Sequence, residues 1–590
     1  MGALSNEAQQ HFDAQSQAIA TCAKYYFSNG QVAGFDSISV EPSARPEPLQ
    51  AIFDSIEEKY QAKIDDAVRM GIEAYQSRNG GELPHPSVIA SALSAGKSVA
   101  EGKYNQAMFD GLAQFDDISN GSYEQAAVVP AMTVVTIANV IANSLPIVAM
   151  LPNPTNSVRV PVVAVRYMTD SAFGAMAQGD YLDGANAALP YAEGRFAFAL
   201  TAESATPNVY AVTARTTYED FTAKTPNENG DLLPFLSGNV SLRVNGRELA
   251  HTRGDQNLSV AKGSVSATIK RPEIEIAGTT FTLNAVSVNI DTRTITATFD
   301  QALPANTAIE VHLVADFDAK DGSKKHLLNP VGVSLEPEYD LIQSVPVVNH
   351  INVSYNTNNQ MANELGVGFV GAALAAMQGK YFLEQNVRLL KEAKDRAKYT
   401  SGDGAAKRIF TFDASRGATG NLTAAMNTTA DLIREILKFI QFAKLKIRQA
   451  SGGATVRFGL YVGDLGAVFF NQLDSSVFTK TGATASWGEI VRIGTLNDGT
   501  DVYHTPTAQG VVIEGVNAAE IMLVGNGNEP ARNPMVGTIT QPPIFREAKP
   551  DTRDIQFGLH AQMAAELNPL ERYADQVALI EMINLPALGA

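Results

Sequence analysis

Two glycine-containing segments resemble the sequence patterns of phosphate-binding loops. Gly366–Gly371 reads Gly-x-Gly-x-x-Gly, the pattern of a dinucleotide-binding turn. That turn must follow a strand directly and precede a second strand that ends in an acidic residue, and the sequence predicts neither. Gly96–Ser98 reads Gly-Lys-Ser, the end of a phosphate loop, but Ser91 stands where the first glycine is required. We interpret Gly366–Gly371 as glycines that let a helix pack closely, and we expect no nucleotide cofactor.

Metal-binding and nucleophilic patterns are equally weak. Asp316, Asp318 and Asp321 suggest a calcium loop, but the spacing is off by one and no bidentate glutamate follows. No two of the 8 histidines lie within ten residues of each other, and no Gly-x-Ser-x-Gly segment occurs. The lone cysteine, Cys22, allows neither an intrachain disulfide nor a cysteine metal site. We therefore expect no metal, cofactor or catalytic residue, although a site assembled from distant residues stays open.

The composition indicates a large, acidic, multidomain protein. The chain has 590 residues, 45% of them hydrophobic, and a net charge of −17. That length suggests several domains, and the hydrophobic content is enough for buried cores. The negative charge argues against a dedicated nucleic-acid binder, whose affinity would come from clustered cations. It does not exclude a shell that encloses nucleic acid.

One uncharged stretch, residues 125–158, is the candidate for a membrane-spanning helix. Its length nearly suffices, but Pro130 and Pro146 interrupt it and no basic cluster flanks it. We predict a short buried helix over Thr133–Leu145 and no membrane contact. The first residues also lack the basic flank and apolar run of a signal peptide, so synthesis in a cytosol is expected.

Residues 1–125 are predicted to be a helical region. In Pro48–Tyr75, apolar residues recur at three- and four-residue steps, which predicts one long amphipathic helix ended by Gly80 and Gly81. So long an apolar stripe fits an arm that lies on another chain, or a core helix of an N-terminal domain. The sequence leaves both interpretations open.

Residues 126–224 are predicted to carry an extended hairpin after the buried helix. Val158–Tyr167 and Arg195–Thr201 are rich in strand-forming residues, and a segment spaced with glycine and alanine joins them. A two-stranded hairpin is marginal alone in water, so we expect this one to pack on another surface.

Three further regions complete the predicted organisation. Residues 225–340 alternate apolar and polar residues in short runs, with a phase slip at Ala285 that indicates a bulge, and predict an inserted β-sandwich. Glu336–Asp340 is interpreted as an acidic linker at its end. Residues 341–405 predict a strand, Val345–Tyr355, and a long helix, and residues 406–590 predict a mixed α/β unit with a closing strand near the C-terminus. The predicted fold class is α+β.

This order of elements resembles the major capsid proteins of tailed double-stranded-DNA bacteriophages, the Hong Kong 97-type fold. Val158–Thr201 is similar to their extended loop, residues 341–405 to the peripheral domain with its spine helix, and residues 406–590 to the axial domain. The segment from Asn533 to Gly537 and the later run from Phe557 to Gln562 also have the character of such C-terminal regions. The inserted sandwich departs from the minimal fold.

The resemblance implies a self-assembling shell protein without catalytic activity. Its partners would be copies of itself in hexamers and pentamers, a portal, a decoration or cement protein, and genomic DNA enclosed without sequence recognition. It would be located in the virion and assembled in the host cytoplasm. The charges that the predicted hairpin would offer to a neighbouring subunit are Arg159, Arg166, Asp180, Asp183, Glu193 and Arg195.

The resemblance also raises two processing questions. Some relatives form covalent cross-links through a lysine of the extended loop, but no lysine occurs between Lys103 and Lys224, so we expect none here. Many relatives lose an N-terminal segment, whereas we expect the helical region to remain as an arm or internal support. An encapsulin-type shell, a β-sandwich adhesin or glycan-binding surface protein, and an enzyme with an unrecognised site remain alternatives.

Overall fold

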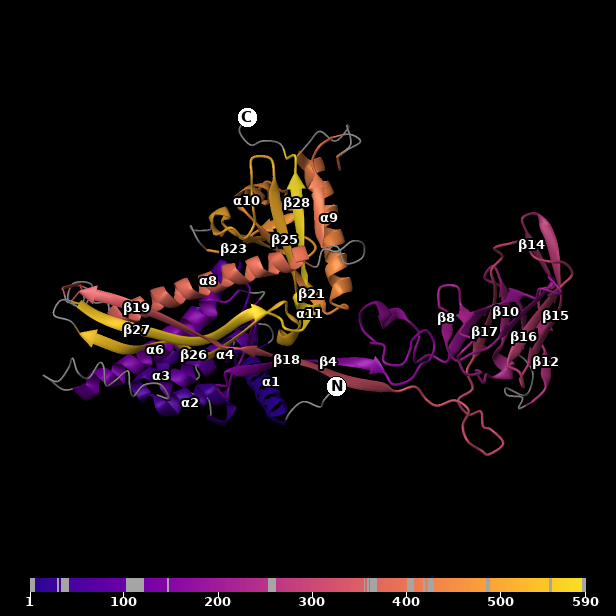
Figure 1. The fold of residues 1–590 in the computed structure, drawn as a ribbon, viewed down its shortest axis with the longest axis horizontal. Coiled ribbons are helices and arrows are strands. Elements are labelled where there is room, and N and C mark those ends of the chain that lie inside the picture. The colour runs from indigo at the N-terminus through magenta and orange to yellow at the C-terminus, as the bar shows by residue number, and fades with distance from the viewer. Residues whose placement is uncertain are drawn as a thin grey trace. The chain divides into compact units, whose positions relative to one another are not determined.

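The structure is a computed structural model, and the chain divides into two compact units (Figure 1). Unit 1 comprises Met1–Ala164 and Pro337–Ala590, and unit 2 comprises Val165–Glu336. Helices and strands occur in separate stretches, so the fold is α+β, as predicted. The residues described are 6–28, 31–32, 42–101, 121–145, 148–252, 262–354, 356–357, 360, 369–399, 408–416, 420–422, 429–483, 489–550 and 554–585.

Unit 1 begins with helices that share one hydrophobic core. α3 and α4 both pack against α6, and Gly71 of α3 lies so close that an added Cβ would stand 2.9 Å from the Cβ of Ile141. Glycine is therefore required where the two helices approach. The elements are α1 (Asn6–Tyr26), β1 (Phe27–Ser28), β2 (Gln31–Val32), η1 (Pro42–Ala44), α2 (Glu47–Ser55), α3 (Glu58–Arg78), α4 (Pro86–Ala100) and α6 (Gly121–Asn143).

The prediction of a single helix over Pro48–Tyr75 is wrong. The chain is extended at Ile56 (φ −117°, ψ 142°) and Glu57 (φ −57°, ψ 141°), which separates α2 from α3. The apolar repeat continues through this break because both helices face the same core, so periodicity alone does not reveal it. The stripe of α3 is fully buried within its own chain, which selects the core interpretation over the arm for these residues.

Helix α8 (Phe369–Tyr399) packs against α6 and explains the polar residues inside the uncharged stretch. The Asn139 amide donates to Oε1 of buried Gln378 at 2.9 Å, and the Asn386 amide donates to the carbonyl of Asn143 at 3.0 Å. These amides therefore join two helices. Within the described part of the chain, no helix is long and apolar enough to cross a membrane.

Two sheets of unit 1 flank α8. The four-stranded sheet has the order β19 (Val345–Ser354), β27 (Asp554–Leu567), β26 (Met535–Pro550) and β3 (Val148–Leu151). The seven-stranded sheet has the order β20 (Ile409–Asp413), β28 (Val577–Ile583), β25 (Ala519–Gly527), β21 (Thr455–Val462), β24 (Asp501–His504), β23 (Val491–Leu496) and β22 (Phe478–Lys480). The associated helices are α9 (Thr429–Ala450), α10 (Asp464–Asn471), α11 (Glu571–Ala574), η5 (Thr507–Gln509) and η6 (Pro530–Arg532). The strand at 345–355, the helix to 398 and the closing C-terminal strand match the prediction.

The predicted hairpin between Val158–Tyr167 and Arg195–Thr201 is wrong in its pairing. β4 (Arg159–Thr169) forms a two-stranded sheet with β18 (Val333–Gln343), and unit 2 is inserted between these strands. β5 (Arg195–Ala199) instead pairs with β17 (Ile309–Val314) of the sandwich. Alternation identifies a strand but not its partner, which here lies more than a hundred residues away. Glu336–Asp340, interpreted as a linker, is part of β18.

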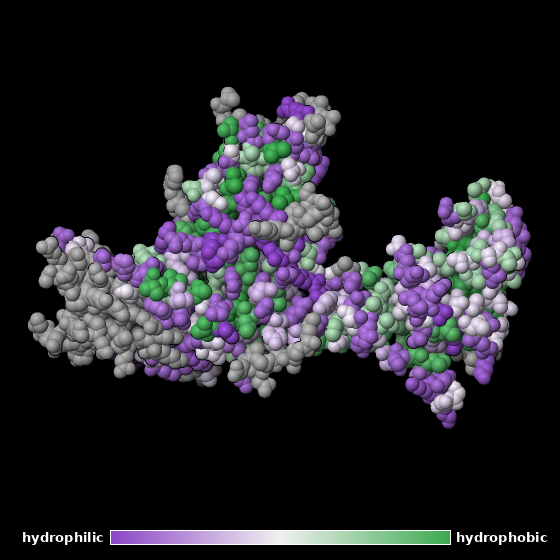
Figure 2. All heavy atoms as spheres, viewed as in Figure 1, coloured by the Kyte–Doolittle hydropathy of each residue, from purple (hydrophilic) through white to green (hydrophobic). Residues whose placement is uncertain are grey.

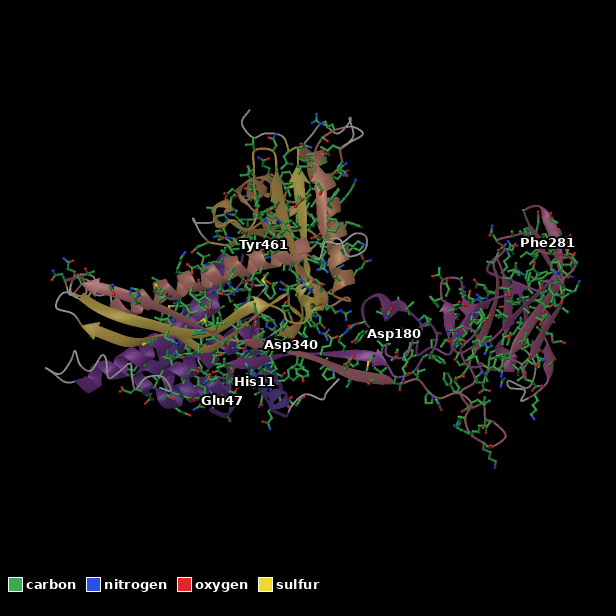
Figure 3. All side chains as sticks on the ribbon, in the orientation of Figure 1. His11, Glu47, Asp180, Phe281, Asp340 and Tyr461 are labelled. Carbon is green, nitrogen blue, oxygen red and sulfur yellow. The ribbon has the colours of Figure 1, made fainter. Side chains whose placement is uncertain are left out.

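Unit 2 is a β-sandwich with its own hydrophobic core, which includes Phe281 (Figure 3). One sheet has the order β13-β11-β10-β17-β5 and the other β12-β15-β16-β7-β6, with β14 paired to β15. The register shift between Leu283 and Ala285 confirms the predicted bulge. The remaining bounds are η2 (Gly184–Ala188), β6 (Thr201–Ala202), β7 (Val209–Thr213), β8 (Tyr218–Asp220), β9 (Thr225–Pro226), η3 (Ser237–Asn239), β10 (Ser241–Val244), β11 (Arg247–His251), β12 (Ser264–Ser266), β13 (Thr268–Ile269), β14 (Glu273–Ile276), β15 (Thr279–Asn289) and β16 (Thr294–Phe299).

Candidate assembly surface

Arg166 and Asp183, two of the predicted inter-subunit charges, bind each other. The Arg166 guanidinium donates to Asp183 through Nη2 at 2.7 Å and through Nε at 3.3 Å. It also lies over the Tyr181 ring, 3.1 Å from its centroid. The Arg166 side chain is only 4% exposed. A buried, bidentate, stacked arginine holds its own loop together, so it does not present its charge to a neighbour.

The other four predicted charges differ in their surroundings. Asp180, in the loop after β4 (Figure 3), accepts a hydrogen bond from the backbone N–H of Ala177 at 2.8 Å and closes a turn. Glu193 and Arg195 lie 3.6 Å apart and are largely exposed, and Arg159 is exposed in unit 1. Arg159 belongs to unit 1 and the other five residues belong to unit 2. Whether the exposed ones meet a neighbouring subunit stays a prediction.

A feature that the sequence analysis missed is an apolar row along β18. Val333, Leu335, Tyr339 and Leu341 occupy alternate positions, so they share one face of the strand, and they are 55%, 60%, 41% and 46% exposed. The opposite face includes Ile342, which is fully buried against unit 1. The period-two alternation was readable from residues 333 to 343, but three acidic residues and a proline in that segment favoured a linker.

Two further exposed apolar residues lie in the next strand, three positions apart and therefore on opposite faces of it. Val345 and Val348 of β19 are 56% and 68% exposed. β19 pairs with β27 and is the last strand at its end of the four-stranded sheet. We call the exposed side chains of Val333, Leu335, Tyr339 and Leu341 the ribbon face. A row of large apolar side chains exposed on one face of a strand is typical of a surface that another chain covers.

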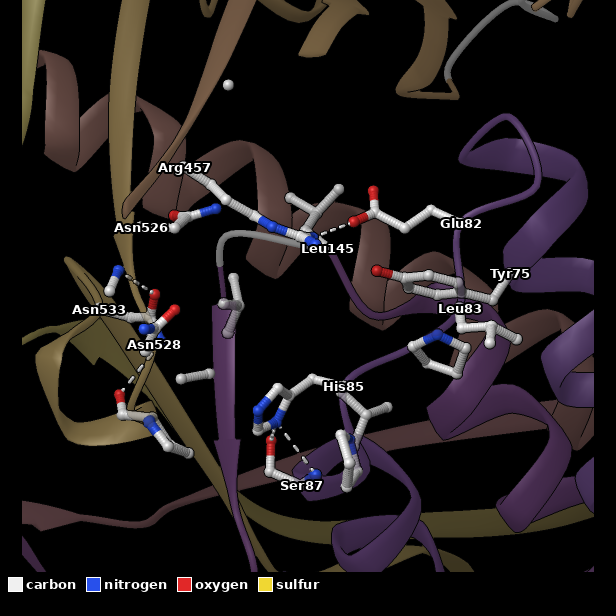
Figure 4. A pocket seen from close by; sticks show the side chains of 18 of the residues that line it. Tyr75, Glu82, Leu83, His85, Ser87, Leu145, Arg457, Asn526, Asn528 and Asn533 are labelled. Atoms are coloured by element: carbon white, nitrogen blue, oxygen red, sulfur yellow. Dashed lines mark hydrogen bonds and ion pairs between the residues drawn. The ribbon is translucent and has the colours of Figure 1, made fainter. Parts of the chain in front are cut away.

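A pocket of about 590 Å³ in unit 1 is the clearest candidate for small-molecule chemistry (Figure 4). Nδ1 of His85 lies 2.8 Å from Oγ of Ser87, which resembles a base beside a nucleophile. The same Nδ1 accepts the backbone N–H of Ser87 at 3.2 Å, so it caps the first turn of α4. Burial and the nearby Arg457 lower the pKa of His85. Among the described residues no carboxylate bonds to this imidazole, so the pair is accounted for as a helix cap.

The charged residues near this pocket form a network between α3 and the seven-stranded sheet. The Arg492 guanidinium donates to the carbonyl of Asn79 at 2.8 Å and contacts carboxylates of Glu82 at 3.3 Å and Asp501 at 2.5 Å. Burial raises the pKa of Asp501, and Arg492 opposes that shift. Each carboxylate faces an arginine, which is the arrangement of a structural ion network. Among the described residues, no cluster of histidine, cysteine or carboxylate side chains fits a metal ion.

Comparison with known proteins gives low-level structural likeness only. No family model matches the chain, and no curated protein is similar to it in sequence. The solved structures to which it is similar are mostly bacteriophage capsids. The jumbo bacteriophage PhiKZ capsid is 8% identical with a TM-score of 0.35, over 74% of this chain and 91% of that chain.

Two further structures illustrate the range of these likenesses. The mature capsid of bacteriophage PhiM1 is 12% identical with a TM-score of 0.27, over 46% of this chain and 80% of that chain. The SrpI encapsulin from Synechococcus elongatus is 11% identical with a TM-score of 0.25, over 43% of this chain and 78% of that chain. Because these TM-scores are low, the function must be argued from the chain's own surfaces.

Proposed function

We propose that this chain is the major capsid protein of a tailed double-stranded-DNA bacteriophage, and that its copies assemble into an icosahedral head of the Hong Kong 97-type. The ribbon face is the observation that carries this proposal. Single exposed apolar residues are ordinary on any protein, and Figure 2 has them scattered among hydrophilic ones. A row of four at alternate positions of one strand is not ordinary.

Burial of the ribbon face by another copy supplies the driving force for assembly. Each apolar side chain of this size stabilises a contact by roughly 1.5–3 kcal/mol when it is fully buried. Most of β4 and the Ile342 side of β18 are already buried within the chain, so the exposed ribbon face is the part of these strands that gains most when a second surface covers it. Many such contacts, closed by symmetry, give a stable container without one strong bond.

The remaining assignments follow from this proposal. Copies of the chain would form hexamers and pentamers, with a portal and a cement protein as further partners. The head would be assembled in the host cytoplasm and would hold genomic DNA without reading its sequence. Residues 1–125 would support the shell from within the subunit, 341–405 would be the peripheral domain and 406–590 the axial domain. The chain would need no cofactor and carry out no catalysis.

Negative-stain electron microscopy of the purified full-length protein tests the proposal. We expect closed icosahedral shells. A monodisperse monomer under all conditions of salt, pH and concentration would contradict it. Shells that hold a cargo enzyme and no DNA when purified from their natural source would identify an encapsulin-type compartment instead.

A covalent shell is not expected. β4 and β18 contain no lysine, so the ribbon has no amine with which to form an isopeptide bond to a neighbour. Boiling assembled particles in denaturant should release single chains near 62.9 kDa on a gel. A ladder of denaturant-resistant multimers would refute this expectation.

A further inference from the structure

The outer side of α9 is basic although the chain as a whole is acidic. Between Arg434 and Ala450 the sequence has five basic residues and one acidic residue, whereas the whole chain has a net charge of −17. The acidic residue, Glu435, has a side chain that is only 12% exposed. Positive charge is therefore concentrated on this helix.

The two sides of α9 differ sharply. Ile436, Ile440, Ala443 and Ile447 are buried against the seven-stranded sheet, with which α9 packs (Figure 1). The opposite side is exposed, and its residues follow steps of four and three, which places them on one helix face. We call this face the α9 stripe: Arg434, Lys438, Gln441, Leu445 and Arg448. At 1.5 Å per residue it is about 21 Å long.

The cations of the α9 stripe have little to neutralise them within the chain. Arg434 and Arg448 form no ion pair with any described residue. Lys438 contacts Glu435 at 2.6 Å but is 64% exposed, and an exposed pair of this kind is worth little. Lys444, by contrast, is buried and donates to Asp498 at 2.6 Å. The side-chain amide of Gln441 donates to the same carboxylate, so Asp498 is the one acidic group bonded to the α9 stripe besides Glu435 among the described residues. Burial lowers the pKa of Lys444 and the bond to Asp498 opposes that shift.

We infer that the α9 stripe binds the phosphate backbone of duplex DNA through Arg434, Lys438 and Arg448. This inference rests on the proposed capsid function, which places DNA at high concentration beside one surface of the shell. A duplex carries one charge per about 1.7 Å, so a 21 Å stripe lies along roughly twelve phosphate charges. A line of long cationic side chains attracts the phosphates electrostatically and makes no contact with the base edges. The contact is therefore independent of sequence.

An acidic protein surface is the competing partner for a basic helix. Phe442 and Leu445 are 48% and 50% exposed beside the cations, and a protein partner would bury both. Lys446 already lies over the Phe442 ring, 5.5 Å from its centroid, and adds another cation at this position. DNA would use the cations and leave Leu445 largely uncovered. The two partners therefore differ in how they respond to a change at Leu445.

The test measures binding of a 20-base-pair mixed-sequence duplex to full-length protein at several salt concentrations, with poly-glutamate as the acidic-polypeptide probe. Three phosphate contacts predict a slope of log affinity against log salt of about −2.7, or a loss of roughly 40-fold between 50 and 200 mM salt. The R434Q/K438Q/R448Q variant should lose the salt dependence that these three phosphate contacts contribute. L445S should leave the affinity for DNA unchanged.

The matched control is K59Q/K63Q/R69Q on α3, which removes the same charge from three exposed cations of another helix in unit 1. It should bind DNA as the unmodified protein does. Equal loss in both triple variants, no loss in the α9 variant, or poly-glutamate binding as tight as DNA and weakened by L445S would each overturn the inference. Circular dichroism verifies folding, and microscopy of the same samples scores shells, so a failure of DNA binding is distinguishable from a failure of the capsid proposal.

Discussion

Replacement of Leu335 and Leu341 by aspartate is expected to stop shell assembly while the subunit still folds. Both side chains are about half exposed on the ribbon face, so the subunit alone loses little when they become charged. Only the exposed half of each side chain remains to be buried, so each assembled contact would lose about 1.5–3 kcal/mol of apolar burial, which raises the assembly concentration by roughly 10- to 200-fold. Light scattering and negative-stain microscopy of L335D/L341D across a concentration series measure this shift.

A matched control separates the ribbon face from exposed apolar residues in general. Val516 is 80% exposed in the turn before β25, and V516D adds an aspartate to unit 1 away from the ribbon face. It should assemble as the unmodified protein does, and circular dichroism should report the same secondary structure for both variants. Shells of L335D/L341D at unchanged concentration would show that the ribbon face is not an assembly contact.

Local patterns predicted the sandwich strands well. In each strand, apolar residues on the buried face alternate with polar residues on the exposed face, and this alternation can be read from the strand's own residues. Val286, Val288 and Ile290 point to the core of unit 2, and the slip at Ala285 is a bulge in the pairing of β15 with β16. Alternation within one strand does not reveal which other strand it pairs with. β4 pairs with β18 across the whole of unit 2, and nothing within residues 158–201 carries that information.

Residue type and strand context did not distinguish buried from exposed charges. Arg166 has the same residue type and predicted strand context as Arg159, yet one is buried on Tyr181 and Asp183 and the other is exposed. Only the folded loop decides between a structural arginine and a surface arginine. The ribbon face was missed for the opposite reason, because Glu336, Glu338 and Asp340 share β18 with its apolar residues and the segment was taken for a linker.

Loss of the Asp575 carboxylate is expected to destabilise unit 1 strongly. Its carboxylate accepts from Arg396 of α8 at 2.8 Å and pairs with Arg408, directly before β20, at 2.8 Å. One carboxylate thus joins three segments that are far apart in the sequence. The Arg408 side chain is 8% exposed, so D575N leaves a buried guanidinium without its counter-charge. We expect a loss of about 3–5 kcal/mol, measured by urea denaturation followed by circular dichroism.

The pH dependence of the free energy of unfolding provides an independent test of the ion pairs of Asp575. Burial alone would raise the pKa of Asp575, but hydrogen bonds from Arg408 and Arg396 outweigh it and lower the pKa. A carboxyl group with a lowered pKa contributes full stability above its ordinary pKa near 3.9 and loses it as the pH falls toward the folded value. The difference in the free energy of unfolding between the unmodified protein and D575N should therefore be constant from pH 7 to 5 and shrink below about pH 4.

The matched control is D66N, which removes the same charge from an exposed pair with Arg69 and should cost at most about 1 kcal/mol. If D575N were no less stable than D66N, or if its deficit persisted undiminished in acid, the three segments would not depend on this carboxylate.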